Sequence, residues 1–166
     1  MNDCREMVGG LSWEGAQGGL SRRRVLARRG HYRRVCHGCE IERGAGMRDR
    51  ELDELLLDPG IIRNRLKVYS TRDNAIAALE AIEEFGSLDV YLWSFVDGNT
   101  VINRWRDHTE VPATTELSER MSKALKKRGF RFVGSTICYS LMQATGMVND
   151  HLVTCFRHPQ ASSGHR

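Results

Sequence analysis

The sequence contains no apolar run that approaches the roughly 18 residues needed to span a membrane. Its opening, MNDCREMVGG, has no apolar core of the kind found in secretion signals, so we expect a cytoplasmic protein without membrane contact. Proline occurs only three times and strict two-residue alternation of apolar and polar residues is scarce, so helical spacing dominates. The five cysteines are odd in number and irregularly spaced, which argues against a disulfide framework: Cys4, Cys36, Cys39, Cys138 and Cys155.

What the chain does contain is typical of one globular domain. Its 166 residues are enough for a single hydrophobic core, and 28% of them are charged. The net charge of +4 permits nucleic-acid binding without proving it. The positive charge is clustered, within residues 22–34 and again within 123–131. For the first cluster a solvated basic helix face is the simpler interpretation, and contact with DNA phosphates is the alternative.

Two helices are expected in the first half of the chain. Residues 49–57 form a short one, and residues 60–85 form a long one that Pro59-Gly60 opens and Gly86 ends. The apolar positions that recur every three or four residues in the long helix are Ile62, Leu66, Tyr69, Ile76, Leu79 and Ile82.

The second half is expected to fold as short helices joined by polar loops. Residues 88–96 are too apolar to be exposed and predict a buried segment. A polar loop over 99–114 follows, and then helices over about 117–125 and 135–144. Thr115 or Ser118 is expected to cap the first of these helices.

The turn between these two helices, residues 129–136, has the chemistry of a phosphate site. Gly134 lets the backbone approach a ligand closely, and the free N–H groups of the next helix attract an anion. A basic run precedes the turn, as in a helix-hairpin-helix that grips the DNA backbone without reading its sequence. The candidate backbone contacts are Lys127, Arg131, Gly134, Ser135 and Thr136.

Phe132 and Val133 are expected to anchor this turn in the core. The local pattern alone leaves an alternative open. An ordinary helical hairpin with a glycine turn and solvated lysines would have the same residues, because motifs of this length match by chance.

Four separate blocks of sequence resemble the DNA-3-methyladenine glycosylase I family, and they occur in the family's order and spacing. The longest spans residues 122–144, and the others are 60–65, 92–96 and 148–155. The likeness covers about residues 11–158 and is strongest from residue 52 onward. It implies an all-α fold of the helix-hairpin-helix glycosylase superfamily. That fold would be a single domain over 1–158 whose first 50 residues are divergent, followed by a disordered tail at 159–166.

The resemblance also implies a reaction and a partner. Family members hydrolyse the bond that joins 3-methyladenine to deoxyribose in alkylated double-stranded DNA, during base excision repair. Methylation at N3 makes the base cationic and a good leaving group, so little acid catalysis is needed. The enzyme, expected to be a monomer, must flip the nucleotide out of the duplex into a shaped pocket, which costs a few kcal/mol.

A base pocket is implied by residues 13–21, which match the family's Glu-Gly-x-Gln-x-Gly-Leu-Ser block. By that match Glu14 is the carboxylate that accepts hydrogen bonds from the flipped base and complements its positive charge. An isolated glutamate would more simply lie on the surface, and the surrounding block favours the pocket. The other candidate pocket and wedge residues are Trp13, Gln17, Gly19, Leu20 and Ser21.

Arg22 departs from the family, which has tryptophan directly after the serine. An aromatic ring stacks on a cationic base, whereas an arginine would repel it. The chain therefore leaves an alternative function open: a catalytically impaired or truncated homologue that retains only sequence-independent DNA binding.

His151 and Cys155 are spaced four residues apart, which on a helix puts both on one face, as two ligands of a tetrahedral zinc require. The family completes this site with an early cysteine, which Cys4 matches, and with a histidine that is absent here. We predict one structural Zn²⁺ with an incomplete ligand set, and no metal in the chemistry. The pair Cys36 and Cys39 alone is a weak metal signal.

Asp150 has two interpretations. It lies where other helix-hairpin-helix glycosylases carry a catalytic aspartate, and it is equally suited to cap a helix that bears His151. Trp105 and His108, in the polar loop, are given no role. The residues most simply assigned to the core are Trp93, Phe95, Cys138, Tyr139 and Met142.

Overall fold

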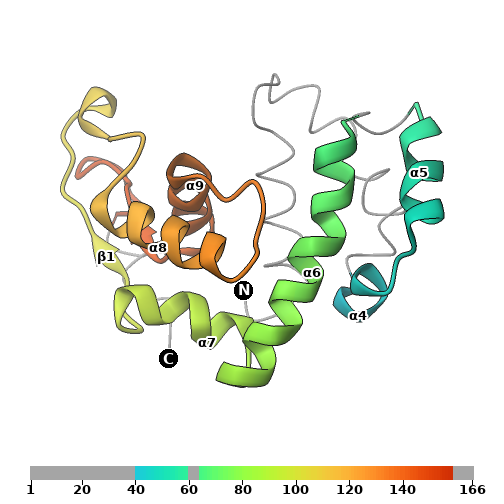
Figure 1. Cartoon of the computed structure of the whole chain (residues 1–166). Helices are drawn as coiled ribbons and strands as arrows, with labels where there is room; N and C mark the ends of the chain where they lie inside the picture. Colours follow the sequence, from blue (N-terminus) through green and yellow to red (C-terminus); the bar gives the residue numbers. More distant parts are fainter. Residues whose placement is uncertain (1–39, 60–63, 159–166) are drawn as a thin grey trace.

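The computed structural model describes residues 40–59 and 64–158, and in this part the chain is predominantly helical (Figure 1). The helices are α4 (Ile41–Ala45), α5 (Asp49–Leu57), α6 (Arg65–Phe85), α7 (Leu88–Trp93), α8 (Glu116–Lys127) and α9 (Ser135–Thr145), with short 3-10 helices η2 (Ser94–Val96) and η3 (His108–Glu110). Strands β1 (Val101–Ile102) and β2 (Val148–Asn149) pair in parallel. The all-α class is confirmed, although β1 and η3 lie in the segment that we expected to be a plain polar loop. None of the described helices is long and apolar enough to cross a membrane.

The long helix α6 is the central element, with α4 and α5 on one side of it and α7, α8 and α9 on the other (Figure 1). We had predicted a start at residue 60, but the helix begins at Arg65. Asn64 has an extended backbone, and its side chain accepts a hydrogen bond from the N–H of Lys67 at 3.3 Å. The helix ends at Gly86, whose positive φ of 83° suits glycine.

The buried face of α6 differs from the predicted apolar stripe. Leu66 and Ile76, two of the periodic apolar positions, are 71% and 42% exposed, so the spacing identified the helix but not its buried face. The core-facing positions are mainly small, and α4 packs against them. A Cβ added to Gly44 on α4 would lie only 3.3 Å from the Cβ of Ala75 on α6. Close approach of two helices favours small side chains at the contact, which the spacing of large apolar residues does not reveal. The buried apolar residues of α6 are Val68, Ala75, Ala77, Ala78 and Ala81.

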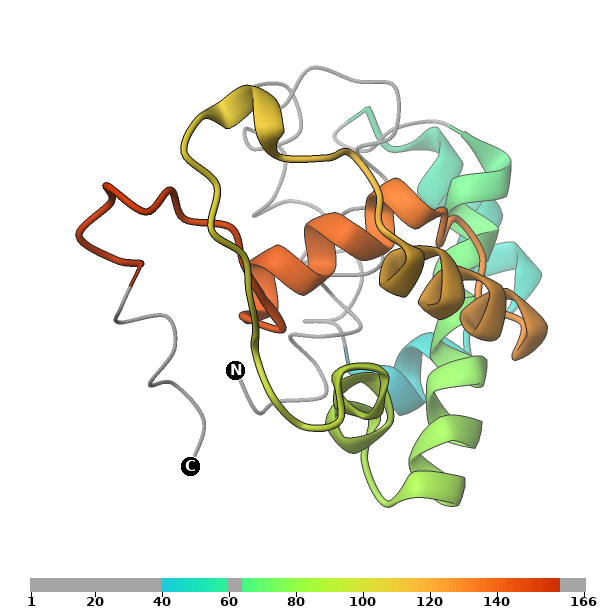
Figure 2. The ribbon, with the colours of Figure 1, turned by 90° about the vertical axis from the view of Figure 1, so that its left-hand side faces the viewer.

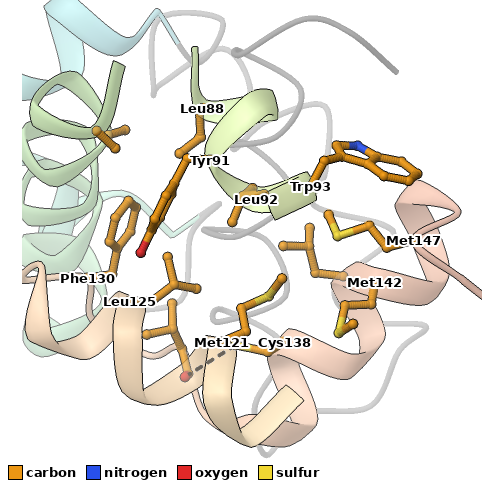
Figure 3. Packing of buried hydrophobic residues seen from close by; sticks show 14 of the residues in the cluster. Leu88, Tyr91, Leu92, Trp93, Met121, Leu125, Phe130, Cys138, Met142 and Met147 are labelled. Atoms are coloured by element: carbon orange, nitrogen blue, oxygen red, sulfur yellow. Dashed lines mark hydrogen bonds between the residues drawn. The ribbon is translucent and has the colours of Figure 1, made fainter. Parts of the chain in front are cut away.

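The main core lies where α7, α8 and α9 meet, and methionine, leucine and aromatic side chains fill it (Figure 3). The segment 88–96 is buried as predicted and forms α7 and η2. Trp93, Cys138, Tyr139 and Met142 are buried, and the partly buried Phe95 packs against the same core cluster. A second, smaller cluster of Met47, Leu52 and Val68 joins α5 to α6.

The N-terminus of α8 is capped as the sequence predicts. The Thr115 hydroxyl accepts a hydrogen bond from the N–H of Ser118 at 3.2 Å, and the Ser118 hydroxyl accepts one from the N–H of Thr115 at 2.9 Å. This reciprocal capping box satisfies two backbone donors at once. It fixes where α8 starts and so helps to set the position of the turn that follows the helix.

Candidate nucleic-acid interface

The turn at 128–134 links α8 to α9, which lie side by side (Figure 2). Phe130 and Val133 anchor it in the core, being 2% and 0% exposed. Phe132, which we expected to share that role, is 39% exposed and has a left-handed φ of 56°. That prediction was wrong because the turn reverses the chain direction, and the ring at its tip is carried outward.

Hydrogen bonds from two helices hold the turn. The buried hydroxyl of Ser122 on α8 donates to the carbonyl of Val133 at 2.6 Å. The side chain of Asn74 on α6 donates to the carbonyl of Arg131 at 3.2 Å and accepts from its N–H at 2.7 Å. The backbone of the turn is therefore fixed by side chains on both sides of it.

The N-terminus of α9 is open. Gly134 is its N-cap and offers no side chain to the helix, and no described atom would lie within 4 Å of a Cβ added there. Its φ of −63° is accessible to any residue, so the conformation of the fold does not require glycine. Ser135 is half-buried and Thr136 exposed at the start of the helix. Among the described residues, none caps the first N–H groups of α9 with a side chain, and this positive end of the helix dipole suits an anion.

The basic residues beside the turn fall into two groups. Lys127 is exposed, and the Arg131 side chain is 68% exposed with its Nε 3.7 Å from a carboxylate oxygen of Asp73. Arg128 is held in the fold, because its guanidinium lies 2.7 Å from a carboxylate oxygen of Glu84. The Arg128 guanidinium also lies over two aromatic rings, those of Phe85 and Tyr91, each at 4.8 Å.

At the other end of α9, Asp150 accepts four hydrogen bonds. One carboxylate oxygen accepts from the side-chain amide of Asn103 and the indole N–H of Trp105, both at 2.7 Å. The other accepts from the Tyr139 hydroxyl at 2.6 Å and the Gln143 amide at 2.7 Å. Burial raises the pKa of Asp150, but these four donors outweigh it and hold the pKa below its ordinary value. Both oxygens are thus engaged in tying the 103–105 segment to α9.

The capping role considered for Asp150 is wrong. The chain from His151 to His158 forms turns rather than a helix, so there is no helix for Asp150 to cap. Instead the side chain of Asn149 accepts from the N–H of His151 at 3.1 Å. Trp105, to which we assigned no role from the sequence, donates a hydrogen bond to Asp150. An indole N–H in a polar loop needs an acceptor when it is partly buried, and this was the signal that could have identified it.

The candidate metal ligands His151 and Cys155 come together without the helix that was expected to align them. The Sγ of Cys155 lies 3.7 Å from Nδ1 of His151. Over the described ranges no cluster of three or more histidine, cysteine or acidic side chains could hold a metal ion. A tetrahedral zinc needs four ligands, and the described residues bring together only these two candidates; the third candidate, Cys4, lies outside the described residues.

The predicted base pocket also lies outside the described residues. This applies to Trp13, Glu14, Gln17, Gly19, Leu20 and Ser21, and equally to Arg22. Their roles stay predictions.

The described residues form a helical domain with a basic hairpin and a hydrophobic cluster on each side of α6, as expected for a helix-hairpin-helix protein. The methyladenine glycosylase family profile matches residues 1–158. The chain belongs to the methyladenine glycosylase family.

Curated relatives agree with this assignment. The chain is 40% identical over 157 residues to DNA-3-methyladenine glycosylase 1 of Escherichia coli K12, covering 95% of this chain and 84% of the relative. It is also 40% identical over 154 residues to DNA-3-methyladenine glycosylase of Haemophilus influenzae, covering 92% of this chain and 83% of the relative.

Solved structures agree as well. A crystal structure of a 3-methyladenine DNA glycosylase I superposes with a TM-score of 0.88 at 44% identity, covering 96% of this chain and 87% of the other. A variant of such an enzyme in complex with 3-methyladenine gives a TM-score of 0.91 at 25% identity, covering 100% of this chain and 87% of the other. The structure of the enzyme from Staphylococcus aureus gives a TM-score of 0.90 at 25% identity, covering 100% of this chain and 86% of the other.

Proposed function

We propose that this chain is a DNA-3-methyladenine glycosylase, which hydrolyses the N-glycosidic bond of 3-methyladenine in alkylated DNA. The observation that carries the proposal is the open N-terminus of α9 behind Gly134, with exposed Lys127 close by in the sequence, in a chain that matches the methyladenine glycosylase family over residues 1–158. Relatives at 40% identity are named for this activity, and a structural neighbour binds the free base.

The reaction uses water and needs no cofactor. The bond between C1′ of deoxyribose and N9 of the base breaks, and the cationic base leaves as neutral 3-methyladenine. The hydroxyl of water goes to C1′ and its proton to solvent. Because the leaving group is already activated by its charge, the protein's work is to extrude and hold the nucleotide.

The hairpin supplies the grip on the duplex. The N–H groups at Ser135 and Thr136 bind a phosphate at the positive end of α9, and Gly134 lets the phosphate approach. Lys127 and Arg131 add charge that strengthens binding without reading sequence. The double-stranded substrate, a monomeric enzyme and a cytoplasmic location belong to the same proposal.

Glu14 is proposed as the pocket carboxylate that accepts hydrogen bonds from the flipped base. An ionised acceptor both bonds and complements a cationic adenine. Arg22, which follows Ser21 in the sequence, stands where the family has its stacking tryptophan, and we expect it to weaken the preference for a charged base.

A structural zinc is a separate proposal. The contact between His151 and Cys155 suits two of its ligands, and Cys4 with one further donor from residues 1–39 would complete the set. No step of the reaction passes through this metal. Metal content measured by mass spectrometry on the purified chain should be near one zinc per chain, and Cys155→Ser should lower it. An equal zinc content in the wild type and Cys155→Ser would refute the assignment of Cys155 as a zinc ligand.

The activity is tested by incubating the purified chain with methylated duplex DNA and measuring released 3-methyladenine. Release is expected from the wild type and strongly reduced release from Glu14→Gln. If neither protein releases the base, while both bind DNA in a salt-sensitive way, the chain is the impaired DNA-binding homologue instead.

A further inference from the structure

Asn74 is a buried polar residue in the middle of α6 that the DNA-binding hairpin motif does not include. It is 2% exposed and shares its helix face with alanines. Burying a carboxamide costs free energy unless its donor and acceptor are both satisfied. Here both are satisfied by the backbone of Arg131, which lies 57 residues further along the chain.

The Asn74 side chain holds Arg131 by its backbone N–H and by its backbone carbonyl. The Asn74 side chain accepts from the Arg131 N–H at 2.7 Å and donates to the Arg131 carbonyl at 3.2 Å, as a neighbouring β-strand would. The next residue, Phe132, has a left-handed φ of 56°, which a residue with a side chain rarely adopts unless its surroundings impose it. Asn74 is therefore placed to impose the turn that leads into Gly134 and α9.

Other residues of α6 meet the same turn. A carboxylate oxygen of Asp73 lies 3.7 Å from Nε of Arg131, and the Lys67 ammonium lies 5.9 Å from the centroid of the Phe132 ring. Lys67 and Asn74 are seven residues apart, which places them on one face of the helix. The outer side of the hairpin is thus supported by α6, while Ser122 of α8 holds its inner side at Val133.

We propose that Asn74 is a positioning residue for DNA binding, which holds Arg131 and Phe132 so that the hairpin backbone and the N-terminus of α9 meet one phosphate together. The proposal rests on the proposed function in taking the DNA backbone as the ligand. It adds that the binding unit comprises α6 as well as α8, α9 and their turn. Asn74 itself contacts no DNA.

The test compares Asn74→Ala with the wild type in the full chain, using an undamaged duplex oligonucleotide and fluorescence anisotropy over a range of salt concentrations. We expect the Kd to rise about tenfold, because two buried backbone groups lose their partner and the turn relaxes. We also expect the slope of log Kd against log salt to fall by about one, because Arg131 would no longer be held where its guanidinium can neutralise a phosphate. Loss of stability alone would not change that slope.

The matched control is Leu52→Ala, which weakens the α5–α6 cluster, where no hairpin residue takes part. Assayed at a temperature at which it is folded, it should keep the wild-type Kd and slope. Hydrogen exchange gives a second readout that needs no DNA. The amides of residues 129–134 should exchange faster in Asn74→Ala than in the wild type, and at the wild-type rate in Leu52→Ala. If Asn74→Ala does not fold, Asn74→Asp keeps the acceptor for the Arg131 N–H and serves for the exchange measurement.

Wild-type affinity, slope and exchange in the folded Asn74 variants would overturn the proposal, as would an equal loss of affinity in Leu52→Ala. These outcomes are separate from the fate of the proposed function. A wild type that binds duplex DNA but releases no 3-methyladenine refutes excision and leaves Asn74 testable by binding. A wild type that excises the base while Asn74→Ala binds normally refutes the role of Asn74 alone.

Discussion

The two ends of α9 handle polar groups in opposite ways. At its N-terminus, Gly134 gives the helix no side-chain cap, and no atom of the described part of the chain would lie within 4 Å of a Cβ added to it. Just beyond its C-terminus, the Asp150 carboxylate accepts hydrogen bonds from four side chains. The first N–H groups of a helix have no partner within it, so an end without a side-chain cap from the described residues is suited to an anion.

The Asp150 network and the N-terminus of α9 are therefore expected to have different roles. A carboxylate whose oxygens each hold two donors has no acceptor site ready for a water or a sugar, so Asp150 is structural in this fold. It ties the 103–105 segment and α9 together next to the His151 and Cys155 pair. The α9 N-terminus is instead the proposed site for a DNA phosphate.

The largest effect is expected from Asp150→Asn. The new amide would direct N–H groups at donors that now bond to an oxygen, and we expect a loss of about 3 kcal/mol in the free energy of unfolding. Thermal unfolding followed by circular dichroism should therefore show a Tm lower by about 10 °C. Below that Tm, excision of 3-methyladenine should fall less than about tenfold, whereas loss of a general acid or base costs about 10²–10⁴.

Asp107→Asn is the matched control for this prediction. Asp107 caps η3 in the same loop and accepts from the N–H and hydroxyl of Thr109, but it is exposed. We expect a much smaller change in Tm. A stable Asp150→Asn protein that has lost excision would show instead that Asp150 acts in the chemistry.

A smaller effect, opposite in sign for stability and binding, is expected from Gly134→Asp. Aspartate is a better N-cap than glycine by a few tenths of a kcal/mol, so the Tm should rise slightly. The new charge would lie where we place a phosphate, and like charges meeting in an interface cost several kcal/mol. We expect the Kd for duplex DNA to rise about 30-fold, roughly 2 kcal/mol, in an anisotropy titration.

Gly134→Asn separates charge from bulk, because asparagine has nearly the same shape and caps equally well. It should weaken binding much less than aspartate does. If Gly134→Asp bound DNA as tightly as the wild type, the open end of α9 would not be the phosphate site.

The elements that sequence predicted well depend on neighbours in the chain. Local backbone chemistry determines the bounds Asp49–Leu57, the Thr115 cap and the helix end at Gly86. The hairpin likewise carries its own signal, because Gly134 and the start of α9 are consecutive.

What sequence missed depends on contacts between distant residues. The core face of α6 is set by how closely α4 approaches it, and spacing alone favoured the exposed Leu66 and Ile76. The partners of Asp150 include Trp105, 45 residues away, and Arg128 pairs with Glu84, 44 residues away. No local pattern distinguishes the structural Arg128 from its exposed neighbour Lys127.

Arg128 and Lys127 give the last and smallest pair of effects. Arg128→Gln removes the ion pair with Glu84 and the contacts over two rings, so it should lower the Tm slightly and leave DNA affinity unchanged. Lys127→Gln should leave the Tm unchanged and weaken DNA binding, with a salt slope lower by about one. A lower affinity in Arg128→Gln would place Arg128 on the DNA after all.

The Glu84 ion pair also predicts a pH dependence. The hydrogen bond from Arg128 is the largest cause of a lowered pKa at Glu84, which weak burial only partly opposes. A carboxyl whose folded pKa lies below its unfolded value of about 4.3 stabilises the fold above that value, and the contribution is lost as the pH falls through the folded pKa. The Tm difference between wild type and Arg128→Gln should therefore be full near about pH 7 and shrink as the solution is acidified below about pH 4. A difference that stayed constant would mean that ring contacts alone hold Arg128, since their strength does not depend on the charge of Glu84.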